Sequence, residues 1–337
     1  MIQLSDPRPP APLPYDALNP DAVLGCVEAL GLRTDGRLLA LNSYENRVYQ
    51  VGLEDAVPVV AKFYRPQRWS DAQVLEEHAF LAELAAAEVP AVPALAFEGR
   101  TLHHREPFRY ALFLRRGGRA PDLSRDEHLE RLGRFIARIH AVGRAARFAH
   151  RPRFEPTRRA GEAIVAVEQL APLPEYLRPA WGLAARELAA GVAAAFEAAG
   201  TLDATRLHGD CHPGNVMWTD GGPHFVDFDD CLSGPPIVDL WMLLSGPRAE
   251  MEHQLRVVLE GYDEFGEFDR STLGLVEPLR ALRMLDYAGW ISRRWTDPAF
   301  PLAFPWFPTT RWWEEQVDTF REQRERLDEP ALRPERD

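Results

Sequence analysis

The chain has 337 residues, of which 46% are hydrophobic and 27% are charged, and it carries a formal net charge of −12. These proportions are those of ordinary globular proteins, so they exclude a disordered or fibrous chain. An acidic protein repels polyanions, and we therefore expect neither nucleic acid nor an anionic membrane as a partner. At roughly 100–200 residues per domain, the length allows two or three domains or one two-lobed unit.

The cysteines and the N-terminus bear on where the protein works. Cys26, Cys211 and Cys231 are widely spaced without a CxxC pair, so they predict neither a disulfide framework nor a zinc ribbon. The N-terminus lacks the basic and apolar regions of a signal peptide, and no apolar run approaches the ~18 residues of a membrane span. We expect a cytoplasmic, monomeric protein.

The first third of the chain has mostly strand character. Residues 1–20 are a Pro-rich lead-in, after which a short helix begins at an Asn19 or Asp21 cap. The hydrophobic patterns and turn residues then predict strands at 37–41, 46–52 and 57–64, a helix at 72–88, and strands near 94–98 and 110–114. Arg116-Gly117-Gly118 breaks the pattern as a hinge would, and a solvated loop is the alternative.

Helices dominate after residue 118. The patterns predict helices at 125–143, 161–171 and 176–200, a β-rich core at 205–231, and helices from there to the end. We expect the tryptophans of 290–313 to pack terminal helices on a core. The sequence thus predicts an α+β fold with two lobes: an N-lobe at 21–117, with a small antiparallel sheet and one key helix, and a mainly helical C-lobe at 118–337.

One segment combines acidic and amide residues in a meaningful order. Within residues 206–230, His208-Gly209-Asp210 is followed by Asn215 with four residues between Asp210 and Asn215, as in the kinase loop H-R-D-x-x-x-x-N. Gly209 stands where that loop has arginine. Asp227-Phe228 follows an apolar run, like the kinase D-F-G with aspartate in place of glycine.

Phosphoryl transfer explains these residue types. Its transition state is loose, so the protein mainly positions groups and neutralises charge. Asp210 would accept a hydrogen bond from the attacking hydroxyl. Asn215 and Asp227 would supply the hard oxygen ligands that Mg²⁺ prefers.

Lys62 is the only lysine in the chain, and the other 38 basic residues are arginine. It ends the run Val59-Val60-Ala61-Lys62, which resembles the kinase V-A-I-K strand whose lysine bridges the α- and β-phosphates of ATP. A helix glutamate holds such a lysine, and residues 72–88 offer Glu76 and Glu77. We prefer Glu77, because it shares a face with the apolar residues of that helix.

The turn at 41–46 contains no G-x-G-x-x-G. Its backbone N–H groups and the Ser43 hydroxyl are still able to cap nucleotide phosphates. We therefore predict that Ser43 and Asn46 belong to the nucleotide site, although Asn-Ser is also a common turn sequence.

In this order, Lys62, Glu77, the loop 208–215 and Asp227 resemble the aminoglycoside phosphotransferase-like branch of the protein-kinase-like superfamily. Strings such as LNSYENRVYQV (41–51), LHGDCHPGN (207–215) and RRWTDPAFP (293–301) look more specifically like bacterial serine/threonine protein kinases that act in stress responses. The resemblance implies ATP and Mg²⁺ as cofactors and protein Ser/Thr hydroxyls as acceptors, including those of the chain itself. It also implies that Asp210 and Asp227 are catalytic, that Asn215 and Asp227 bind Mg²⁺, and that Ser43 contacts ATP.

Other functions compete with this interpretation. Only about seven residues separate Asp229 from the helix expected near Ile237, which leaves no room for an activation segment. Small-molecule kinases share this feature, so a kinase for an aminoglycoside, choline or homoserine hydroxyl is the alternative. A catalytically dead scaffold is disfavoured because the chain has all five residues that the kinase reaction needs: Lys62, Glu77, Asp210, Asn215 and Asp227. A metal hydrolase that uses His208, Asp210 and His212 is disfavoured because Pro213 interrupts the helix that would place the two histidines on one face.

Overall fold

The computed structural model describes residues 15–41 and 43–334, which form two compact units. The first unit contains the chain up to Ser70 together with Leu95–Arg115, and the second contains Asp71–Ala94 and the chain from Arg116 onward. The boundary at Arg115 lies next to Gly117-Gly118. Most of the Pro-rich lead-in falls outside the described residues.

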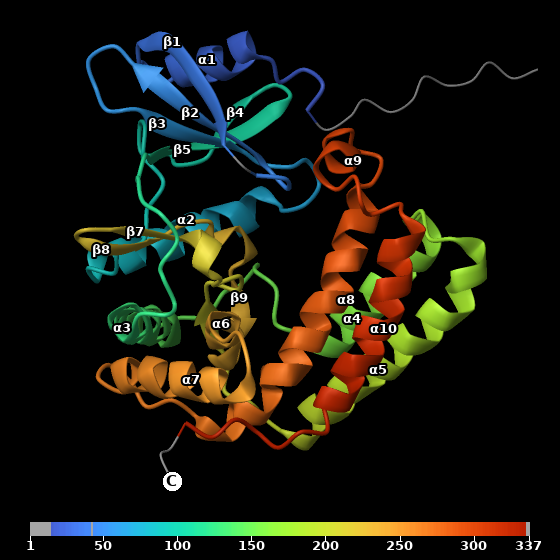
Figure 1. Ribbon diagram of the computed structural model, residues 1–337. Helices are drawn as coiled ribbons and strands as arrows, with labels where there is room; N and C mark the ends of the chain where they lie inside the picture. The colour runs from blue at the N-terminus through green and yellow to red at the C-terminus, as the bar shows by residue number, and fades with distance from the viewer. Residues whose placement is uncertain (1–14, 42, 335–337) are drawn as a thin grey trace, which may run out of the picture. The chain divides into compact units, whose positions relative to one another are not determined.

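A five-stranded antiparallel sheet forms the first unit, with the strand order β1-β2-β3-β5-β4 (Figure 1). The strands are β1 (Thr34–Leu41), β2 (Arg47–Leu53), β3 (Val59–Phe63), β4 (His103–Arg105) and β5 (Phe108–Leu114). The valine-rich β3 is the central strand, and its Lys62 lies opposite Val48 of β2 and Ala111 of β5. Both edges of β3 are therefore paired, which fixes the direction of the Lys62 side chain.

The strand predicted at 94–98 is wrong. Leu95 donates one backbone hydrogen bond to Leu112, but Glu98 and Gly99 both have positive φ and turn the chain back at once. Pro93 before the segment has no N–H to give to a ladder. The fifth strand is the short β4 instead, which pairs with β5.

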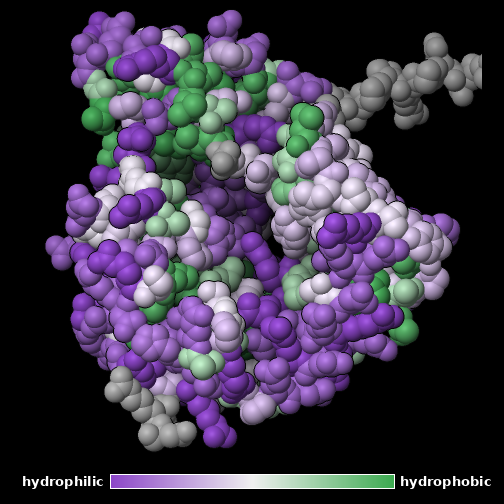
Figure 2. All heavy atoms as spheres, in the orientation of Figure 1, coloured by the Kyte–Doolittle hydropathy of each residue, from purple (hydrophilic) through white to green (hydrophobic). Residues whose placement is uncertain are grey.

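Helix α1 (Pro20–Glu28) covers one face of the sheet. Asn19 caps it by accepting the Ala22 N–H at 2.8 Å, and Pro20 is its first residue, as the sequence predicted. Its apolar side packs on the strands in one core cluster, whose buried members include Val23, Val27, Val51, Phe63 and Leu112. Figure 2 shows further hydrophobic side chains gathered over this unit, and Leu39 and Val57 are among those that remain exposed.

Helices make up most of the second unit (Figure 1). They are α2 (Asp71–Ala86), α3 (Asp126–Arg144), α4 (Pro156–Leu170), α5 (Arg178–Ala198), α6 (Ile237–Leu240), α7 (Arg248–Tyr262), α8 (Val276–Arg294), α9 (Ala299–Ala303) and α10 (Thr310–Arg326). Two antiparallel strand pairs accompany them: β6 (Thr205–Leu207) with β9 (Leu232–Gly234), and β7 (Val216–Thr219) with β8 (Gly222–Phe225). The predicted α+β class, with an antiparallel sheet in one unit and mainly helices in the other, is confirmed.

Helix α2 groups with the second unit, although the predicted N-lobe at 21–117 would contain it. It packs on α3, and its Phe80 lies edge-on to Phe228 with 6.0 Å between the ring centroids. These contacts lie inside the helical unit, so they place α2 beside the segment that follows β8.

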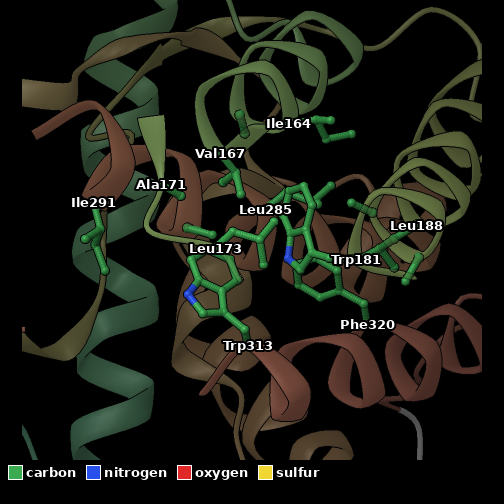
Figure 3. Close-up of a cluster of buried hydrophobic side chains, with 14 of the residues drawn as sticks. Ile164, Val167, Ala171, Leu173, Trp181, Leu188, Leu285, Ile291, Trp313 and Phe320 are labelled. Atoms are coloured by element: carbon green, nitrogen blue, oxygen red, sulfur yellow. The ribbon is translucent and has the colours of Figure 1, made fainter. Parts of the chain in front are cut away.

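One hydrophobic core cluster of the second unit lies among α4, α5, α8 and α10 (Figure 3). Trp181 and Trp313 are fully buried there in an edge-to-face pair with 6.1 Å between ring centroids. The other tryptophans of 290–313 pack against the same cluster: Trp290, Trp295, Trp306 and Trp312. The prediction that these aromatic residues pack a core is confirmed.

Two glycines let α3 and α7 approach each other closely. A Cβ atom at Gly133 would lie 2.0 Å from the Val258 carbonyl oxygen, and one at Gly261 would lie 2.0 Å from that of Glu130. Only glycine fits at such contacts. None of the helices in the described residues combines the length and the apolar character that a membrane span requires.

Candidate active site

The loop between β6 and β7 carries Asp210 and Asn215, two of the predicted site residues, and His208 forms its buried core. The His208 ring is fully buried and packs on Phe228, with 4.2 Å between the centroids. Its Nε2–H donates to the Val226 carbonyl at 2.9 Å, and its Nδ1 accepts the Asp210 N–H at 3.3 Å. Both ring nitrogens are therefore engaged in holding the loop, which argues further against a metal hydrolase that uses His208 as a ligand.

Gly209 explains a departure from the kinase loop. It has φ +85°, and a Cβ atom there would lie 2.1 Å from the Asp230 carbonyl oxygen. No side chain fits in that space, and an L-residue would be strained at that φ. The close approach draws the catalytic loop against the segment after Asp227, and the arginine of the kinase motif has no room at this position.

Asp239 of α6 holds the same loop through hydrogen bonds to its backbone. Its carboxylate accepts the backbone N–H groups of His208 at 2.9 Å and Gly209 at 2.8 Å. His140 Nε2 lies 3.0 Å from it, and the other ring nitrogen of His140 lies 2.9 Å from the Tyr262 hydroxyl. Burial alone would raise the pKa of Asp239, but the His140 hydrogen bond and the other donors outweigh it and lower the pKa.

Removing this carboxylate is expected to lower the free energy of unfolding substantially. In Asp239→Ala, two buried N–H groups and His140 lose their acceptor, and breaking a buried charged network costs about 3–5 kcal/mol. We expect that loss in the free energy of unfolding measured by urea titration. Tyr262→Phe removes only the outer hydroxyl and should cost about 0.5–1.5 kcal/mol. Equal losses in the two variants would contradict the central role of Asp239.

The β7–β8 hairpin brings Asn215 and Asp227 to the same end. Val216 lies opposite Phe225, and the next residue, Val226, donates its N–H to the Asn215 carbonyl at 3.0 Å. The Asn215 amide nitrogen donates to the Asp210 carbonyl at 2.9 Å, so its amide oxygen is the atom that could bind a cation. Two hard oxygen donors, one amide and one carboxylate, fit Mg²⁺, which takes its other ligands from phosphates and water.

Asp227 itself has an unusual backbone. It adopts φ 58° and ψ 62°, in the left-handed region, immediately before the short 3₁₀ turn η3 (Phe228–Asp230). Aspartate and asparagine tolerate this region better than most residues, because their short side chains form local hydrogen bonds. The strained turn sets where the segment with Asp227 leaves the hairpin.

An arginine and a histidine lie beside Asp210. Arg283 of α8 places its Nη1 3.0 Å from Oδ1, and His212 places its Nε2 3.6 Å from Oδ2. Burial lowers the pKa of His212, and although Asp210 opposes this, Arg283 reinforces it. The short turn η2 (Pro213–Asn215) begins after His212, whose Nδ1 accepts the Gly214 N–H at 2.9 Å. At neutral pH the fixed positive charge beside Asp210 is therefore that of Arg283.

The two glutamates of α2 have different partners. Glu76 accepts three backbone N–H groups, from Ala149 at 2.5 Å, His150 at 2.8 Å and Arg151 at 2.7 Å. Glu77 is 1% exposed, and its Oε2 lies 2.7 Å from Arg151 Nη2. Burial alone would raise the pKa of Glu76, but the three backbone donors outweigh it and lower the pKa.

The remaining predicted residues belong to the sheet unit. Lys62 is 6% exposed on β3, with its Nζ 5.1 Å from the centroid of the Tyr64 ring. Asn46 is buried, and its amide oxygen accepts the Arg65 N–H at 3.1 Å, which ties the turn before β2 to the chain after β3. Ser43 is half-buried just after β1. Glu77, Asp210, Asn215 and Asp227 lie in the helical unit.

Comparison with known proteins agrees with this arrangement. The model of the phosphotransferase enzyme family matches residues 37–274. Stress response kinase A of Escherichia coli K12 is 44% identical over 318 residues, which cover 94% of this chain and 96% of that protein. A protein named serine/threonine protein kinase RdoA, from Salmonella typhimurium LT2, is 42% identical over the same shares of both chains. The resemblance inferred from the sequence is confirmed.

Solved structures show the same fold at low identity. An amicoumacin kinase in complex with AMP-PNP and Ca²⁺ has a TM-score of 0.70 and 17% identity, and the match covers 91% of this chain and 93% of that one. A microcompartment-associated aminopropanol kinase has a TM-score of 0.66 and 16% identity, and the match covers 88% and 94%. These similarities confirm the predicted kinase-like fold.

Proposed function

Because the chain belongs to the phosphotransferase enzyme family, we propose that it transfers the γ-phosphate of ATP to serine and threonine hydroxyls of proteins, itself included. The reaction would use Mg²⁺ and serve a bacterial stress response in the cytoplasm. The observation that carries the phosphotransfer assignment is the β7–β8 hairpin, which brings Asn215 next to Asp227 while Asn215 is tied to Asp210. A hydroxyl-activating carboxylate beside two oxygen ligands for a cation is what phosphoryl transfer requires.

Asp210 acts on the acceptor in this proposal. Its carboxylate accepts a hydrogen bond from the attacking hydroxyl, aims an oxygen lone pair at the γ-phosphorus and takes the proton late in the reaction. Arg283, with its Nη1 3.0 Å from this carboxylate, stands close enough to meet a transferring phosphoryl group. His208 and Asp239 fix the loop, so the carboxylate needs no reorganisation before the reaction.

The predicted cofactor residues have separate roles in this proposal. Asn215 and Asp227 would hold Mg²⁺, which neutralises charge on the β- and γ-phosphates when it is bound. Lys62 would bridge the α- and β-phosphates, with Ser43 and Asn46 at the nucleotide. Since three backbone N–H groups already take up Glu76, we assign Glu77 as the α2 carboxylate that holds Lys62.

The choice of acceptor rests on the relatives. At 42–44% identity over nearly the whole chain, they are named stress response kinase or serine/threonine protein kinase, which supports a protein acceptor. The alternative is a small-molecule hydroxyl kinase. One observation favours it: β9 and a tight turn fill residues 230–236, so the platform on which many protein kinases bind a peptide has no room there.

One assay separates the two acceptors. The protein is incubated with γ-labelled ATP and Mg²⁺, with and without a generic basic protein, and a panel of amino alcohols and sugars is tested in parallel. Label on serine or threonine of either protein supports the proposal. ATP turnover that occurs only with the small alcohols would replace it with the alternative.

Asp210→Asn tests the role of the proposed proton acceptor. The variant keeps the shape of the side chain but loses its charge, and the role belongs to the transition state. We expect kcat to fall by on the order of 10²–10⁴, with the ATP dissociation constant little changed. Steady-state kinetics and nucleotide titration measure the two quantities. An intact kcat with much weaker ATP binding would instead place Asp210 on the nucleotide.

A further inference from the structure

Arg151 lies in the loop between α3 and α4, and all three nitrogens of its guanidinium donate hydrogen bonds in the interior of the helical unit. Its side chain is fully buried, and Nη2 lies 2.7 Å from the Glu77 carboxylate. Nη1 donates to the Asp229 carbonyl at 2.7 Å, and Nε donates to the Gln73 carbonyl at 2.8 Å. A planar guanidinium suits three acceptors that lie in different directions, whereas an ammonium carries its donors on a single atom.

The loop around Arg151 also holds α2 through its backbone. Glu76 accepts the N–H groups of residues 149–151, and the Gln73 side chain donates to the His150 carbonyl at 3.1 Å. Two successive glutamates of α2 therefore bind the same loop: Glu76 binds its backbone N–H groups, and Glu77 binds the Arg151 guanidinium. These contacts explain why α2 belongs to the helical unit rather than to the strands that precede it in sequence.

The third partner of Arg151 links α2 to the metal segment. Asp229 lies two residues after Asp227, inside the turn η3, and its carbonyl is bound by the same guanidinium that binds Glu77. We propose that Arg151 is a positioning residue that holds the Glu77 carboxylate and the turn after Asp227 in a fixed relation. The inference rests on the proposed function, since it assigns Glu77 to the lysine and Asp227 to the metal.

This arrangement needs no covalent modification. The three partners of the guanidinium named above are side-chain or backbone groups of the chain itself, and the short connection at 230–236 leaves no room for a segment that phosphorylation would order. Losing Arg151 would leave the buried Glu77 carboxylate without one of its compensating charges and would release the η3 turn. Misplacement by about 1 Å at a phosphoryl-transfer site costs on the order of 10²-fold in rate.

Arg206 provides a matched control. It is another buried arginine that pairs with α2, with Nη2 2.5 Å from Glu83 Oε2 and 2.9 Å from the Val142 carbonyl. It also lies over the Phe80 ring, with 4.6 Å between the guanidinium carbon and the centroid. Arg206→Gln therefore removes a buried arginine that contacts the same helix, although its partner Glu83 is exposed. Arg206 contacts neither Glu77 nor the turn after Asp227; its other partners are the Gly143 carbonyl and the Phe148 ring.

The test compares Arg151→Gln, Arg151→Lys and Arg206→Gln in the full chain, by melting temperature, kcat and the Mg²⁺ concentration for half-maximal rate. We expect Arg151→Gln to lose kcat by on the order of 10–10² and to need several-fold more Mg²⁺, with Arg151→Lys between it and the wild type. Arg206→Gln should lower the melting temperature about as much as Arg151→Gln does. Its kcat and Mg²⁺ requirement should stay within about threefold of the wild type. Equal kinetic losses in Arg151→Gln and Arg206→Gln, or wild-type kinetics in Arg151→Gln, would overturn the inference.

Hydrogen exchange tests the same link without any turnover. In Arg151→Gln, amides of α2 and of residues 226–230 should both exchange faster than in the wild type, whereas Arg206→Gln should leave 226–230 unchanged. Unchanged exchange at 226–230 in Arg151→Gln would overturn the inference even in a protein that transfers no phosphate. If the variants show this exchange pattern while the wild-type chain transfers no phosphate, only the proposed function is overturned.

Discussion

Asp227→Ala is expected to lose phosphoryl transfer by on the order of 10³-fold or more, because a metal ligand supplies several kcal/mol of charge stabilisation in the transition state. The folded state should survive the change. Asp227 stands in the left-handed region, however, and alanine there costs about 1–2 kcal/mol, so the melting temperature should fall by several degrees. Labelled-phosphate transfer and thermal melting measure the two effects separately.

Asp227→Asn is the matched control for the backbone. Asparagine tolerates positive φ, so this variant should melt close to the wild type and still transfer phosphate poorly, because it has lost the charge that holds the cation. Excess Mn²⁺ should restore part of the rate in the Asn variant and less in the Ala variant, which has no oxygen ligand at this position. Normal transfer in either variant at low Mg²⁺ would remove the metal assignment.

Several elements could be predicted because their signals are local. The Asn19 cap and Pro20 fix the start of α1, and the valine-rich run marks β3. The spacing of Asp210 and Asn215 is equally local, since a short turn and a hairpin bring them together within one loop. Patterns of this kind survive in any context, because the partners lie within a few residues of each other.

The strand predicted at 94–98 is absent for a local reason. Residues 94–97 form a short apolar run like that of a strand, yet Glu98-Gly99 turns the chain before a ladder forms, and the turn chemistry prevails over the pattern. An apolar run indicates burial. It does not report whether a neighbouring strand is within reach.

The supporting residues of the site could not be predicted because their partners are distant in sequence. Asp239 lies 31 residues from His208, and Arg151 lies 74 residues from Glu77. Arg151 and Arg283 are two of 38 arginines, and nothing local distinguishes them from surface residues. Asp239 had one usable signal, a single carboxylate at the head of the apolar run DLWMLL, where an acid needs buried partners.

Lys62→Arg should nearly abolish phosphoryl transfer, although it conserves charge and introduces the residue that the chain uses at 38 other positions. Lys62 is buried on the central strand, between Val48 and Ala111 of the neighbouring strands. The position of its Cα atom is therefore fixed, and a wider side chain has little space. In the proposed site a compact ammonium bridges two phosphates and meets Glu77. A guanidinium is wider and planar and favours a two-pronged pairing with the carboxylate.

The expected loss is on the order of 10²-fold or more in kcat, the scale for misplacing a phosphate contact. Stability should change little, because a cation is kept at the same position. Arg37→Lys, an exposed charge-conserving change on β1, is the matched control and should transfer phosphate like the wild type. In the wild type, an amine-reactive ATP analogue should label Lys62 as the only side chain, besides the N-terminal amine, and excess ATP should protect it. An Arg variant that keeps most of its activity, or labelling that ATP does not prevent, would mean that another group anchors the phosphates and that Lys62 is a remnant in an arginine-rich chain.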